Sequence, residues 1–209
     1  MLSIGDIFII FFITLGPLKL IVPFARRTQD MDDSQLRQTA LHAAAIATVV
    51  AIGGSLLGKQ MLLAWHVSIA ALIIAAGIIL FIVALRQLLE QYNQEVQPPP
   101  APAIPMAATS AHARAIRLVF PVVLTPYGLA AIIAALAART ETQHISMVLG
   151  LVLVIMSLNL LAMLYARRIL SGPVVVVLQM VGAILAVLQS ALAVQFLIVG
   201  VHMLATTPK

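Results

Sequence analysis

Residues 7–27 read IFIIFFITLGPLKLIVPFARR, an apolar run that ends in two arginines and has Pro17 near its middle. A bilayer core about 30 Å thick requires about 20 mostly apolar residues for one helical crossing. Just before the run, Ser3 and Asp6 have the spacing of a helix-capping box. The run lacks the basic start and the Ala-x-Ala exit of a cleavable signal peptide. The sequence therefore predicts a first membrane-spanning helix at Ile7–Ala25 that contains a proline.

The composition of the whole chain agrees with a membrane protein. Of its 209 residues, 62% are hydrophobic and 9% are charged, and the mean hydropathy is +1.10. A soluble domain is about 45–50% apolar and about 25% charged, so a cytosolic enzyme and a disordered protein are excluded. The net charge of +5 comes from 12 basic residues that lie mostly between the apolar runs, which argues against a nucleic-acid partner. The chain has no cysteine, which excludes disulfides and thiolate chemistry.

Further apolar runs predict an all-α membrane protein with six transmembrane helices. The lipid bilayer is therefore a predicted partner. The six predicted spans are Ile7–Ala25, Ala40–Gly58, Val67–Leu85, Leu118–Ala138, Ile145–Ala166 and Val174–Leu204.

The basic residues between the spans predict the orientation, because cytoplasmic loops carry an excess of lysine and arginine. The loops after the first, third and fifth spans hold eight of them: Arg26, Arg27, Arg37, Arg86, Arg114, Arg117, Arg167 and Arg168. The opposite side holds three, namely Lys59, Arg139 and Lys209. This asymmetry predicts a multi-pass protein of a plasma membrane with both termini outside.

A proline-rich segment divides the chain into two similar halves. Residues 97–105 read QPPPAPAIP, which cannot continue a helix and favours a semi-rigid spacer. We predict a first three-helix repeat at residues 1–95, a cytoplasmic linker at 96–113 and a second repeat at 114–209. With three spans in each half, the second half would be inverted relative to the first, an arrangement that recurs in transporters.

The two mid-span prolines occupy corresponding positions in these halves. Pro17 lies nine residues before Arg26, and Pro126 lies nine residues after Arg117. Nine helical residues span about 13 Å, so both prolines are expected near the middle of the bilayer. A proline there kinks or interrupts the helix and frees a backbone carbonyl. A matched pair of such helix breaks indicates a substrate site, although a single proline would more simply be a kink.

The residues beside these prolines are the candidate binding groups: Gly16, Pro17, Lys19, Thr125, Pro126, Tyr127 and Gly128. Lys19 places a charge inside a span, which costs about 2.5–3.5 kcal/mol on insertion scales and suggests a functional role. Its ammonium suits a substrate carboxylate, or its side chain could instead extend to the nearby membrane surface. Tyr127 could contact substrate or bond to a carbonyl that Pro126 frees. The glycines and Thr125 could instead serve helix packing.

Several segments carry a family resemblance. Pro17 followed by Pro23 and Phe24, then IIAAGIILFIVAL at residues 73–85, then Pro121 and Pro126, then AVQFLIVG at 193–200, together resemble the MarC family. This family comprises six-span bacterial inner-membrane proteins related to the lysine-exporter superfamily. The resemblance covers nearly the whole chain except the linker, and it implies an inner-membrane location. Some members are described as transporters of small neutral amino acids.

The chain departs from the family at its two signature motifs. The family's Asn-Pro-x-Gly is Gly16-Pro17-Leu18-Lys19 here, and its Gly-Pro-Gly is Thr125-Pro126-Tyr127 here, so only the prolines match. We expect a secondary transporter of a small polar metabolite such as an amino acid, working by alternating access. The alternative is a non-transporting assembly or interaction protein. An enzyme is not expected, because no metal, phosphate or nucleophile motif occurs. No cofactor is expected either, and the sequence allows a homo-oligomer.

Overall fold

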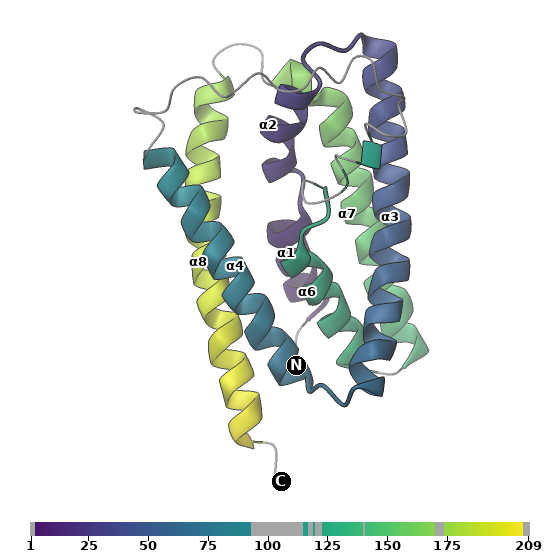
Figure 1. Ribbon diagram of the computed structural model, residues 1–209, viewed down its shortest axis with the longest axis vertical. Helices are drawn as coiled ribbons and strands as arrows, with labels where there is room; N and C mark the ends of the chain where they lie inside the picture. Colours follow the sequence, from purple (N-terminus) through teal and green to yellow (C-terminus); the bar gives the residue numbers. More distant parts are fainter. Residues whose placement is uncertain are drawn as a thin grey trace.

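The computed structural model describes residues 3–92, 115–116, 119, 123–139, 141–169 and 174–206. The elements in this part of the chain are all helices, as Figure 1 shows, and they confirm the predicted all-helical membrane fold. In chain order they are α1 (Ile4–Leu15), α2 (Leu18–Arg27), α3 (Asp33–Ala64), α4 (Ile69–Tyr92), α6 (Pro126–Ala137), α7 (Thr142–Ile169) and α8 (Val174–Thr206).

Five helical stretches in the described residues are long and apolar enough to cross a membrane. They are Ile4–Arg27, Asp33–Ala64, Ile69–Leu89, Thr142–Ile169 and Met180–Thr206. The first of them contains both α1 and α2, and α6 is a shorter apolar helix within the predicted span Leu118–Ala138. Residues 118 and 120–122 of that span lie outside the described residues, as does the whole of the predicted linker at 96–113.

The helix ends follow local capping rules. The Ser3 backbone N–H donates to Asp6 Oδ2 at 2.7 Å and the Asp6 N–H donates to Ser3 Oγ at 3.2 Å, which confirms the capping box at the start of α1. Asp32 caps α3 by accepting from the Gln35 N–H at 2.6 Å. Helix α3 therefore begins earlier than the predicted span at Ala40, because its polar first turns are helical but not apolar.

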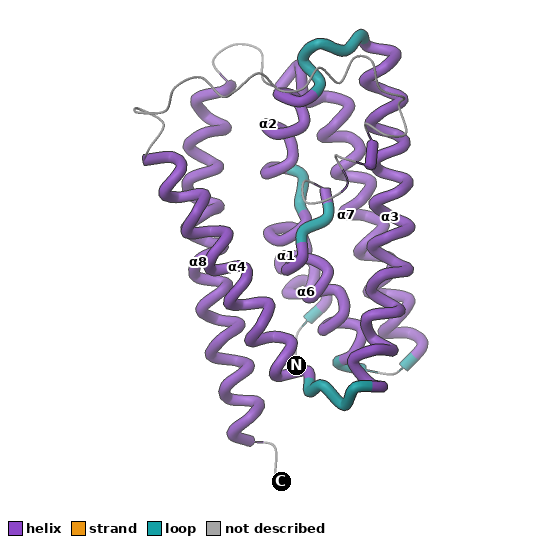
Figure 2. Tube along the Cα trace, in the orientation of Figure 1, coloured by secondary structure: helices purple, strands orange, loops and turns teal. Residues whose placement is uncertain are grey.

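The helices pack into two groups, which Figure 2 shows in the same orientation as Figure 1. Helices α4 and α8 lie side by side along much of their length, and α1, α2, α3, α6 and α7 form the other group. Within the latter, α3 packs on α7 and α6, α2 packs on α7, and α1 packs on α6 and α7, while α4 also packs on α6 and so joins the two groups. Helix α1 begins and α8 ends at the same end of the bundle (Figure 1).

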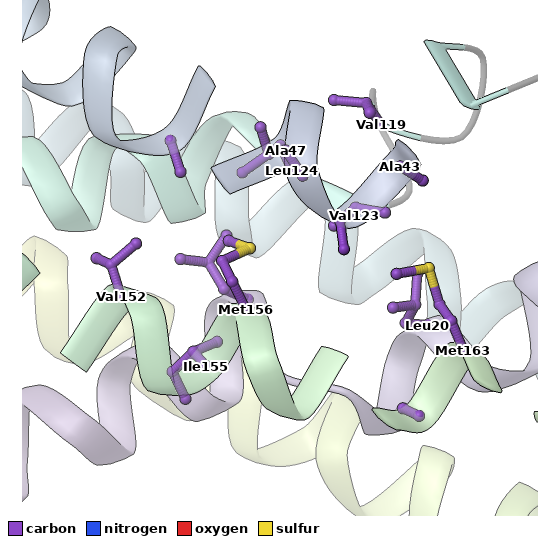
Figure 3. Packing of buried hydrophobic residues seen from close by; sticks show 14 of the residues in the cluster. Leu20, Ala43, Ala47, Val119, Val123, Leu124, Val152, Ile155, Met156 and Met163 are labelled. Carbon is purple, nitrogen blue, oxygen red and sulfur yellow. The ribbon is translucent and has the colours of Figure 1, made fainter. Parts of the chain in front are cut away.

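The main apolar core lies in the larger group and is drawn in Figure 3. One face of α3 contributes a row of buried alanines: Ala40, Ala43, Ala44, Ala47 and Ala51. Small side chains let membrane helices approach closely, and α3 packs on α7, whose buried residues Val152, Ile155 and Met156 belong to the same core.

The pairing of α4 with α8 depends on close approach at a glycine. A Cβ atom on Gly77 would lie 3.0 Å from the Ala193 carbonyl oxygen and 3.1 Å from Phe196 Cβ. The outward faces of this pair carry exposed apolar side chains, including Ile78, Met180 and Ile184. An apolar outer surface of this kind is what contact with lipid requires.

Arg167 joins α7 to the loop between α2 and α3. Its guanidinium donates to the carbonyls of Thr28 and Met31 and lies 3.5 Å from Asp33 Oδ1. Replacing it removes one donor from each carbonyl; the Thr28 carbonyl still accepts from the Met31 N–H at 3.1 Å, but the Met31 carbonyl loses its Arg167 donor, which costs about 1–3 kcal/mol if the carbonyl is left unsatisfied. We expect Arg167→Met to lower the melting temperature of the purified protein by about 4–8 °C. Arg37→Met, at an exposed position near the start of α3, is the control, and equal shifts in both variants would contradict this role.

Candidate functional site

The carbonyl end of α1 lies inside the bundle, next to Gly16 and Pro17. Helix α1 ends at Leu15 and α2 begins at Leu18, and Gly16 has extended backbone angles (φ −69°, ψ 166°). Pro17 has no N–H, so it cannot donate to the carbonyl of Ile13, four residues earlier. That carbonyl accepts instead from Gln189 Nε2 of α8, at 3.1 Å.

The next two carbonyls of α1 also accept from side chains of other segments. Thr125 Oγ1 donates to the Thr14 carbonyl at 3.1 Å, and Asn159 Nδ2 of α7 donates to the Leu15 carbonyl at 2.8 Å. Non-helical backbone at membrane depth is tolerated only where protein or water satisfies it. The end of α1 is therefore held by three polar side chains that come from the second half of the chain.

The start of α6 packs directly on this end of α1. Thr125 is the N-cap of α6 and accepts from the Gly128 N–H at 3.3 Å, while Pro126 occupies the first turn. A side chain on Gly128 would overlap the side chain of Leu15. The carbonyl end of α1 and the amide end of α6 thus meet through Thr125, which contacts both.

Lys19 and Tyr127 form the second contact between the two halves. Lys19 Nζ donates to the Tyr127 hydroxyl at 3.1 Å and lies 4.8 Å from the centre of the tyrosine ring. Both a hydrogen bond and a cation–π contact are available to an ammonium in that position. Tyr127 is 1% exposed and packs with Leu80 of α4 and Ala193 of α8, while Lys19 is half-buried. The pair therefore lies where the two helix groups meet.

The structure brings the predicted site residues together in this one region. Gly16, Pro17 and Lys19 lie where α1 gives way to α2, and the remaining four lie at the start of α6: Thr125, Pro126, Tyr127 and Gly128. The ammonium of Lys19 lies against Tyr127 rather than beside Arg26 at the end of α2. The hydroxyl of Tyr127 accepts a hydrogen bond from that ammonium.

Two residues that contact the end of α1 are absent from the predicted site. Asn159 and Gln189 are uncharged amides within apolar spans, a residue type that commonly joins membrane helices, and their amide nitrogens connect α7 and α8 to α1. The sequence signal that could identify them is an uncharged amide within an apolar span. This signal is not specific, because Gln195 of α8 shares it and is exposed. In the described part of the chain, no group of three or more His, Asp or Glu side chains could hold a metal ion.

A separate depression of about 470 Å³ lies at the other end of α1. It is lined by Ser3, Ile4, Arg139, Glu141, Gln143, His144 and Met147. Twelve helical residues separate this end of α1 from Gly16, a distance of about 18 Å. The depression contains none of the predicted site residues.

Several apolar helical stretches of membrane-spanning length, joined inside by polar contacts, define an integral membrane protein that crosses the bilayer several times. A family model described as MarC family integral membrane protein matches residues 1–205. The chain belongs to the MarC family, as its sequence motifs predict. No curated protein and no solved structure matches it.

Proposed function

We propose that this MarC family protein is a secondary transporter that moves a small polar metabolite, an amino acid, by alternating access. The observation that carries the proposal is the meeting of α1 and α6, with the Lys19 ammonium on Tyr127 beside it. Transporters use helices that are interrupted in mid-membrane, because the free helix ends can bind polar groups there. Pro17 and Pro126 serve as these interruptions in the proposal.

Charge distribution supports a carboxylate-bearing substrate. The starts of α2 and α6 present the positive ends of helix dipoles, and Lys19 lies in the first turn of α2. An anionic group placed there would be attracted by the ammonium and by backbone N–H groups. Gly16 and Gly128 allow close approach of the backbone, and Thr125 and Tyr127 supply hydroxyls.

Helix packing supports an inverted repeat. If residues 1–95 and 114–209 are equivalent, α1 corresponds to the span that contains α6, α3 to α7 and α4 to α8. Each of these helices packs against its counterpart, as elements related by a two-fold axis do when they lie beside that axis. In the proposal the transition between states moves the α4–α8 pair relative to the other group.

The proposed location is a bacterial inner membrane, with the arginine-bearing loops in the cytoplasm. Helix α1 begins and α8 ends at one end of the bundle (Figure 1), which fits termini on the same side. We expect a tag fused after Lys209 to be cleaved by protease added to intact spheroplasts, in which the outer membrane no longer shields the outer face of the inner membrane. A tag that is cleaved only after cell lysis would reverse the orientation.

Thiol accessibility tests the alternating access itself, because the chain has no native cysteine. Leu18→Cys introduces a thiol at a half-buried position beside Lys19. We expect a membrane-impermeant maleimide to label it in both right-side-out and inside-out vesicles. The exposed controls Gln29→Cys and Gln143→Cys lie at opposite ends of the bundle, and each should react in one vesicle orientation only.

The altered motifs favour one second candidate, a non-transporting membrane assembly protein. Lys19 stands where the family has glycine, and Tyr127 stands where it has the second glycine of Gly-Pro-Gly. Under this alternative the Lys19–Tyr127 contact holds the two halves together permanently. Labelling of Leu18→Cys from one side only, or from neither side, would support this alternative over the transporter.

A further inference from the structure

Two buried amide oxygens beside the end of α1 have no hydrogen-bond partner in the described part of the chain. They are Asn159 Oδ1 and Gln189 Oε1, on side chains that are 1% and 2% exposed. A buried acceptor left unsatisfied costs about 1–3 kcal/mol, so such groups usually serve a purpose. The amide nitrogens of both residues are already used by α1 carbonyls.

The orientation of these amides is fixed by their partners. Turning either amide over would place its oxygen against the carbonyl oxygen of Leu15 or Ile13, which cannot donate. Both oxygens therefore stay free, each held beside an α1 carbonyl by its own amide nitrogen. Asn159 comes from α7 and Gln189 from α8, so the two oxygens approach the end of α1 from different helices.

The end of α1 is also electrostatically negative. A helix dipole places partial negative charge on its last carbonyls, and the last turn of α1 holds no basic residue. The three side chains that donate to it are all neutral, and each carbonyl keeps a second lone pair. The charge of Lys19, the first basic residue after α1, lies on Tyr127.

We propose that the end of α1, with Asn159 Oδ1 and Gln189 Oε1, binds a monovalent cationic group. Carbonyl and amide oxygens are the ligands of hard cations, and the carbonyl ends of interrupted helices hold such ions in transporters. All of the contributing oxygens are neutral, which suits a single positive charge. The cation is either a free alkali ion such as Na⁺ or the ammonium group of the transported solute, and this inference rests on the proposed transport function.

Thermal unfolding of the purified protein in detergent tests the proposal without requiring transport. Choline chloride is replaced by sodium chloride or by methylammonium chloride at constant ionic strength. At a concentration about one hundred times the dissociation constant, the bound cation should raise the melting temperature by about 5 °C. A rise with Na⁺ alone identifies an inorganic ion, and a rise with methylammonium alone identifies the solute's ammonium. No rise with either would overturn the proposal.

Variants separate cation binding from a merely structural role. Asn159→Leu and Gln189→Leu each remove one free oxygen, and at least one of them should weaken the cation affinity about tenfold or more. Gln195→Leu, at an exposed position on α8, should keep the full cation-dependent rise. A structural defect would lower the melting temperature equally in all three salts. A wild-type rise that persists undiminished in both amide variants would contradict the assignment.

The outcome is independent of the transport assay. If the cation raises the melting temperature but no solute is transported, the cation site stands and the transporter proposal fails. If solute is transported while neither cation stabilises the protein, the cation site is wrong and the amides serve only to hold α1.

Discussion

Replacing Lys19 by methionine is expected to raise the KM for carboxylate-bearing solutes about hundredfold in reconstituted liposomes. A hydrogen bond to a charged group is worth about 1.5–3 kcal/mol, and about 2.7 kcal/mol corresponds to a factor of one hundred. Methionine keeps much of the length and apolar volume of lysine but removes the ammonium that lies on Tyr127. The fold should survive, because a half-buried charge is exchanged for an apolar group.

Two controls test whether this increase in KM is specific to Lys19 and to the carboxylate. Lys59→Met removes the other lysine of the described helices, in α3 and far from the junction of α1 and α6, and should leave KM unchanged. An analogue that lacks the carboxylate should be affected little by Lys19→Met, because it makes no ion pair. An unchanged KM for the carboxylate solute would show that Lys19 has no part in binding it.

The second large effect is expected from Gly16→Ala. A Cβ atom on Gly16 would overlap the Phe12 carbonyl oxygen and lie 2.8 Å from its carbon. Backbone atoms cannot rotate away as the end of a side chain can, so the last turn of α1 must shift. We expect a loss of about 3 kcal/mol, at the upper end of overpacking costs. The melting temperature should fall by about 6–10 °C.

Gly53→Ala is a matched control, for which we expect unchanged or increased stability. Gly53 lies inside α3, and a Cβ atom there would have no neighbour within 4 Å. Alanine is favoured over glycine in a helix by about 1 kcal/mol, so this variant should be as stable as wild type or more stable. Similar melting temperatures for the two variants, measured by thermal unfolding in detergent, would contradict the close approach of Gly16 to the Phe12 carbonyl.

Local sequence signals predicted much of the fold. The capping box at Ser3 and Asp6 depends on residues three apart in the chain, and the apolar runs depend on hydropathy alone. Both kinds of signal are local and do not depend on how the helices pack. The structure confirms both. Helix α3 begins at Asp33, before the predicted span Ala40–Gly58, because hydropathy does not record a polar helical extension capped by Asp32.

The residues that make up the candidate site were harder to predict from the sequence. The prolines drew attention to Gly16 and Thr125, and the structure places these segments in contact. The partners of the α1 carbonyls could not be predicted, because Asn159 and Gln189 are 144 and 176 residues away from them in sequence. The rotation of each helix about its axis decides whether an amide contacts α1, as Gln189 does, or faces outward, as Gln195 does. The sequence does not reveal this rotation, because both amides have apolar neighbours in the chain.

Counterflow in liposomes measures secondary transport itself. The purified wild-type protein is reconstituted with a high internal concentration of an unlabelled amino acid, and labelled amino acid is added outside. We expect transient accumulation of label above that in empty liposomes for at least one member of an amino-acid panel, and less accumulation with Pro126→Ala. Accumulation no greater than in empty liposomes for every amino acid tested would rule out amino-acid transport by this protein.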